Sequence, residues 1–146
     1  MLHPDIQNVL NQQINEGLNA WYFYRAGATY CEEINLPGLS KWMRHRAEGK
    51  FRQATKVSDY LLQRRGHVDH RSVHPPKEGW DAPIELLEHA LTLEQQLGES
   101  VSRIMNLAYS NGDHSTHDFL EPMARQQAQA EGELDRIAER LKLVGD

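Results

Sequence analysis

Residues 42–57 of the chain read WMRHRAEGKFRQATKV, with one glycine and no proline. At helical spacing, a single stripe passes through this stretch in steps of three and four residues. Its ends are apolar, but Lys50 and Gln53 lie at its middle. Polar groups that face a helical core are costly unless they find partners inside the protein. The stripe consists of Leu39, Met43, Arg46, Lys50, Gln53, Val57 and Tyr60.

Four long segments have the periodicity of amphipathic helices, and no alternating run of β-branched residues predicts a strand. We expect one domain, 1–146, with helices at 4–34, 37–65, 83–111 and 114–143, the second ended by Gly66. Residues 66–82 form the only long connection. Fully extended, it reaches about 56 Å, whereas a helix of this size is about 42 Å long. The sequence therefore predicts an all-α, up-down-down-up four-helix bundle whose second and third helices run parallel.

Each predicted stripe is interrupted near the middle of its helix. Gly17 interrupts the first helix, Lys50 and Gln53 the second, Glu94 the third and Gln127 the fourth. Helices of similar length that pack side by side bring their midpoints to one level. We therefore expect a polar layer halfway along an otherwise apolar bundle, the level at which four-helix bundles hold di-iron sites.

Four segments resemble successive pieces of a prokaryotic non-haem ferritin subunit, in the same order and at similar separations. They are LNQQINEGLNAWYFY (10–24), KWMRHRAEGKFRQATKVSDYL (41–61), HPPKEGWDAPIELLEHALTLEQ (74–95) and HDFLEPMARQQAQAEGELDRIAERLKLVG (117–145). The resemblance implies a ferritin-like bundle with a role in iron storage or homeostasis. It further implies a homo-oligomer, at least an antiparallel dimer formed through the first two helices, with other ferritin subunits as further partners. Ferritin subunits usually add a fifth helix, which we do not expect here because the sequence stops at Asp146.

The resemblance also indicates that most di-iron ligands have been replaced. In ferritins that oxidise iron, the position of Gly17 is a glutamate, and those of Lys50 and Gln53 are a glutamate and a histidine. Glu94 and Gln127 match the family. We interpret the set as a vestigial di-iron site: Gly17, Lys50, Gln53, Glu94, Gln127 and Ala130.

A lysine at a ligand position repels a metal ion that requires anionic oxygen ligands. We therefore expect Lys50 and Glu94 to form a buried ion pair, with hydrogen bonds from Tyr24, Gln53 and Gln127. No metal or cofactor is expected at the centre, iron is disfavoured there, and the chain is not expected to oxidise iron by itself. Loss of either charged partner should cost about 3–5 kcal/mol.

Other metal or haem sites receive little support. Phe51 stands where bacterioferritins have the methionine that binds haem, so the resemblance implies no haem. Two histidine groups could bind a surface metal, although neither matches a standard motif and we interpret both as solvated. They are His67, His70 and His74 in the long connection, and His114 and His117 in the fourth helix.

Composition excludes several classes of function. The net charge is -5, with acidic and basic residues mixed along the helices, which argues against nucleic-acid binding. No apolar run is long enough for a membrane span. The single cysteine, Cys31, is typical of a reducing compartment, so we expect a cytoplasmic protein.

Two alternatives to a non-catalytic ferritin homologue remain open. A metal could lie at a displaced site formed by Glu94 with Glu16 or Glu131, although those two glutamates are about 100° from the inward stripe positions. Alternatively, the bundle could be a binding or scaffold module without an iron role, because Gly17 and Ala130 leave space beside the polar layer.

Overall fold

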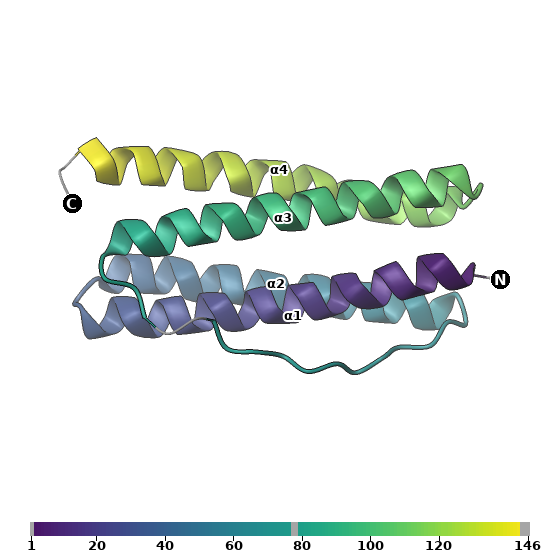
Figure 1. The fold of residues 1–146 in the computed structure, drawn as a ribbon, viewed down its shortest axis with the longest axis horizontal. Coiled ribbons are helices and arrows are strands. Elements are labelled where there is room, and N and C mark those ends of the chain that lie inside the picture. Colours follow the sequence, from purple (N-terminus) through teal and green to yellow (C-terminus); the bar gives the residue numbers. More distant parts are fainter. Residues whose placement is uncertain (1, 77–78, 144–146) are drawn as a thin grey trace.

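The computed structural model describes residues 2–76 and 79–143 (Figure 1). In these ranges the chain forms four α-helices and no strand: α1 Pro4–Glu33, α2 Pro37–Gln63, α3 Pro83–Ser110 and α4 His114–Leu143. The all-α prediction is confirmed. All four helices begin where expected, and the first three end one or two residues earlier than expected.

The helix ends explain these shorter boundaries. Asn35 and Arg65, each two residues past the last residue of α1 or α2, adopt left-handed backbone conformations, with φ of 62° and 60°. In α2, the Gly66 N–H then donates to the Leu61 carbonyl at 2.8 Å, which closes the last turn. The turn is therefore made by Arg65 and not by Gly66. Gly66 is needed for close approach, because a Cβ there would lie 3.1 Å from the Leu61 side chain.

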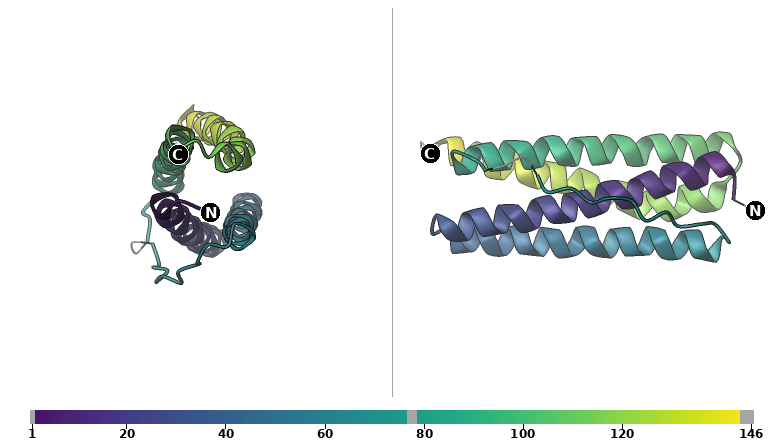
Figure 2. Two further views of the ribbon diagram at one scale, coloured as in Figure 1. Left: turned by 90° about the vertical axis from the view of Figure 1, so that its right-hand side faces the viewer. Right: turned by 60° about the horizontal axis from the view of Figure 1, so that its bottom comes forward.

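The helices are arranged as two antiparallel pairs, α1 with α2 and α3 with α4 (Figure 1). α2 and α3 run in the same direction, so the up-down-down-up topology is confirmed. The connection 64–82 joins them, and its described residues 64–76 pass along the length of the bundle beside α1 (Figures 1 and 2). None of the helices in the described ranges is long and apolar enough to cross a membrane.

Four side-chain amides of α1, spaced four residues apart, bind the backbone of the crossover, and we call them the amide ladder. A four-residue spacing places them in one row on the helix surface. Through this row, the crossover acquires hydrogen-bond partners although it has no regular secondary structure. The bonds are His67 N to Gln7 Oε1 (2.9 Å), Asn11 Nδ2 to His67 O (2.9 Å), Asp69 N to Asn11 Oδ1 (2.8 Å), Asn15 Nδ2 to Ser72 O (2.9 Å) and His74 N to Asn19 Oδ1 (2.7 Å).

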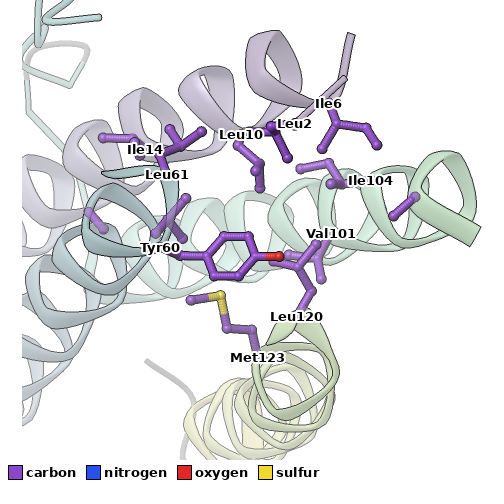
Figure 3. Packing of buried hydrophobic residues seen from close by; sticks show 13 residues of the cluster. Leu2, Ile6, Leu10, Ile14, Tyr60, Leu61, Val101, Ile104, Leu120 and Met123 are labelled. Atoms are coloured by element: carbon purple, nitrogen blue, oxygen red, sulfur yellow. The ribbon is translucent and has the colours of Figure 1, made fainter. Parts of the chain in front are cut away.

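The core consists of two apolar clusters, one toward each end of the bundle. The first includes Leu10 and Leu120 and draws on all four helices (Figure 3). The second includes Met43 and Leu134. Burial of these apolar side chains is the main force that holds the helices together. The buried residues between the two clusters include Gly17, Lys50, Glu94 and Gln127.

Candidate functional site

The Glu94 side chain lies at the centre of this middle layer and is completely buried. Its Oε1 accepts hydrogen bonds from Lys50 Nζ, at 2.7 Å, and from Gln127 Nε2. Its Oε2 accepts from Arg46 Nη2, at 2.8 Å, and from Tyr24 Oη. We call these five residues the Glu94 cluster. Its members come from all four helices, so the cluster joins the two helical pairs.

The cluster differs from the sequence prediction at two residues. Gln53 lies outside it, half-buried, and donates to Gln126 Oε1 at 3.0 Å. Arg46 takes the fourth position instead, with a side chain that is 20% exposed. The physical reason is the length of the arginine side chain, which extends from the edge of the buried stripe to the Glu94 carboxylate. Lys50, Gln127 and Tyr24 lie where they were expected.

The charges in the cluster set its protonation states. Burial alone raises the pKa of Glu94, but the charges of Lys50 and Arg46 outweigh burial and lower the pKa to about 2. Burial lowers the pKa of the Lys50 ammonium, and the charge of Glu94 opposes this effect. For Tyr24, burial and then the charge of Glu94 raise the pKa well above its ordinary value. The phenol is therefore neutral and donates to an ionised carboxylate.

Acid should weaken the fold through this carboxylate. The pKa of Glu94 is lowered from 4.5 to about 2, so its stabilisation is complete above the unfolded-state pKa and is lost as the pH falls from 4.5 toward 2. We expect it to contribute about 3 kcal/mol to the free energy of unfolding at neutral pH. Urea unfolding of the wild type and Glu94→Gln between pH 6 and pH 2.5 measures this contribution. Parallel pH profiles for the two proteins would contradict the prediction.

The donor set does not fit a di-iron centre. A carboxylate has about four lone-pair positions, and four side-chain donors already occupy those of Glu94. The cluster supplies one carboxylate and two cations, whereas iron ions require several anionic ligands. Beside Gly17 there is a cavity of only about 10 Å³, with room for about one water molecule. Gln13 Oε1, which lines this cavity, is buried and has no hydrogen-bond partner among the described residues.

The displaced metal site receives no geometric support. Glu16 is half-buried and lines a cavity between α1 and α3, away from the Glu94 cluster. Glu131 is half-buried beside Gly98, and its pKa is raised by burial and by the charge of Glu94. Neither residue joins Glu94 in a group of three or more potential metal ligands within the described ranges.

The two histidine groups considered as candidate surface metal sites are not brought together within the described residues. In the described part of the chain, one group of three potential metal ligands is present, and it combines His117 with Asp118 and Glu121. His114 is not part of it and instead packs, like His117, against the ring of Tyr109. The three crossover histidines are exposed on the protein surface; they are His67, His70 and His74.

Comparison with known proteins agrees with this architecture. Residues 7–144 match a protein family that is described as "Ferritin-like domain". A bacterial non-heme ferritin of Bacteroides fragilis is 26% identical over the whole chain and 92% of its own length. A soma ferritin of Lymnaea stagnalis is 30% identical over 98% of this chain and 84% of its own.

Solved structures show the same likeness. An open pore ferritin from the hyperthermophilic archaeon Archaeoglobus fulgidus superimposes with a TM-score of 0.97 and is 29% identical. The likeness covers 100% of this chain and 90% of the archaeal one. The match in sequence thus spans nearly all of the chain, and the match in structure spans all four helices. The chain therefore belongs to the ferritin family.

Proposed function

We propose that the chain is an iron-storage subunit of the ferritin family that does not itself oxidise Fe(II). The observation that supports this most directly is the Glu94 carboxylate, whose two oxygens are both engaged by donors of the protein itself. Lys50 and Arg46 add two positive charges at the level where the family's di-iron ligands are expected. The named relatives, which are ferritins, support the role in iron storage. A cytoplasmic location agrees with the single buried cysteine, Cys31.

Iron oxidation is the direct test of this proposal. We expect oxygen consumption after aerobic addition of Fe(II) to be no faster with the protein than with buffer alone, because the Glu94 cluster offers a single carboxylate to bind the ions. Anaerobic Fe(II) loading followed by metal analysis should likewise find no iron retained at the bundle centre. Rapid oxygen uptake that saturates at a fixed number of iron ions per chain would overturn the proposal.

We also propose that the chain works as a homo-oligomer that includes an antiparallel dimer through α1 and α2. An aromatic patch on these helices supports this surface: Trp21 lies 5.9 Å from Tyr22 and 6.0 Å from Phe51, ring centre to ring centre. Tyr22 is 38% exposed and Phe51 is 50% exposed. Neighbouring exposed aromatic side chains are typical of protein interfaces.

The solution mass tests this assembly. We expect light scattering to give a mass of at least two chains for the wild type, and a lower mass for Phe51→Glu, because a carboxylate would be buried without a partner at the interface. Thr92→Glu, at an exposed position of α3 and so outside the proposed α1–α2 surface, is the matched control and should leave the mass unchanged. A monomeric wild type, or an equal loss of mass in both variants, would count against this surface.

A further inference from the structure

A groove between α2 and α4 remains unexplained by the proposed iron-storage role. The end-on view of Figure 2 shows these two helices on the same side of the bundle. They pack less extensively than α1 with α2 or α3 with α4. Between them lies a cavity of about 300 Å³, at the lower end of the range for small-molecule sites.

The lining of this groove is strongly cationic. Four permanent cations line it, and its one carboxylate, Glu133, already accepts a hydrogen bond from Trp42 Nε1 at 2.8 Å. The remaining polar lining includes neutral amides of glutamine residues, which can donate hydrogen bonds to an anion. The cations are Arg46, Lys50, Arg52 and Lys56.

On the inner wall of the groove, two positively charged side chains have only one counterion between them. Arg46 and Lys50 share the single carboxylate of Glu94, and the Lys50 side chain is only 6% exposed. Arg46 Nε is buried without a hydrogen-bond partner in the described part of the chain. Lys50 Nζ has three N–H groups and makes two bonds, to Glu94 at 2.7 Å and to Gln127 at 3.4 Å. Such buried donors are costly unless they are paired.

The outer rim of the groove adds two exposed cations. Arg52 and Lys56 lie four residues apart on α2, and neither forms an ion pair with an acidic residue in the described ranges. Arg46 and Lys50 have the same spacing. Like charges at this spacing repel each other and destabilise a helix. Two such pairs that line one groove are balanced most simply by an anion between them.

From this arrangement, we propose that the α2–α4 groove binds a small multivalent oxyanion of the phosphate type. The planar guanidinium groups of Arg46 and Arg52 match the geometry of phosphate oxygens, and Lys50 supplies a desolvated positive charge. The cavity volume favours a small anion over a nucleic acid, as does the net charge of -5. This binding does not depend on the absence of iron oxidation.

Calorimetric titration of the iron-free, full-length protein with inorganic phosphate and pyrophosphate tests this proposal. We expect saturable binding of one anion per chain, tighter for pyrophosphate and weakened by added sodium chloride, because opposite charges attract and salt screens them. The double variant Arg52→Gln/Lys56→Gln keeps the Glu94 cluster intact and should bind roughly tenfold more weakly. Circular dichroism checks that this variant is folded.

The control is Arg25→Gln/Arg65→Gln, which removes two exposed arginines outside the groove. It should bind as the wild type does. Absence of binding to the wild type, or an equal weakening in both double variants, would overturn the proposal, since the second result indicates only a general effect of net charge. Because no iron is present, neither result depends on the outcome of the iron-oxidation assay.

Discussion

Glu94→Gln is expected to lower the free energy of unfolding at pH 7 by about 3–5 kcal/mol, because the substitution leaves two buried cations without a counterion. The carboxylate is fully buried, with Lys50 Nζ at 2.7 Å and Arg46 Nη2 at 2.8 Å. The neutral amide occupies the same volume, so the loss measures charge and hydrogen bonding more than packing. Urea unfolding followed by circular dichroism, at one fixed protein concentration, gives the value.

Lys50→Met serves as the companion variant. It removes one cation but leaves the Glu94 carboxylate paired with Arg46 and hydrogen-bonded by Tyr24 and Gln127. We therefore expect a smaller loss, of about 2 kcal/mol or less, in place of the equal losses predicted for a simple ion pair. A loss below about 1 kcal/mol for Glu94→Gln, or a larger loss for Lys50→Met, would contradict the cluster described above.

Gly17→Glu/Lys50→Glu/Gln53→His should give a bundle that retains iron and oxidises Fe(II) roughly tenfold or more faster than the wild type. With the native Glu94, these changes provide three carboxylates and one imidazole, and they remove the ammonium group that repels cations. The first substitution is sterically acceptable at its Cβ, which would lie 3.5 Å from Ala54 Cβ. Anaerobic iron loading with metal analysis and oxygen-consumption kinetics measure the two effects.

The matched control for this variant is Gly17→Ala/Lys50→Met/Gln53→Ala. It removes the same lysine but introduces no ligand, so it should neither retain iron nor accelerate oxidation. Equal iron binding by both triple variants would mean that the native lysine, and not the absence of ligands, excludes the metal. A folded Gly17→Glu/Lys50→Glu/Gln53→His variant without iron would refute the interpretation of these positions as a vestigial site.

The helices and their order followed from the sequence, because apolar periodicity and connection length are local properties. The length of the crossover allowed parallel α2 and α3, and the structure has them. The polar middle layer was also predictable, from the interruption at Lys50 and at Glu94, which are 2.7 Å apart between Nζ and Oε1. A polar residue in the middle of an otherwise apolar helical stripe can be recognised from the sequence alone.

The place of Arg46 was harder to predict. Relative to Lys50, Arg46 is rotated by about 40° around the helix and Gln53 by about 60° in the same sense. The two positions therefore differ by only about 20° around the helix, and the resemblance to ferritins favours Gln53, whose position matches a metal ligand. Spacing also says nothing about how far a side chain reaches. The bond from Gln53 to Gln126, at 3.0 Å, depends on tertiary packing that no helix pattern contains.

The amide ladder determines which amino-acid substitutions the crossover tolerates. Its five hydrogen bonds all join side chains of α1 to backbone atoms of the crossover. They therefore do not depend on the identity of the crossover side chains. The path of the crossover along the bundle is therefore determined by residues of α1 and not by residues of the crossover itself. Substitutions along 67–74 should leave the route intact, whereas a single amide lost from α1 would release part of it.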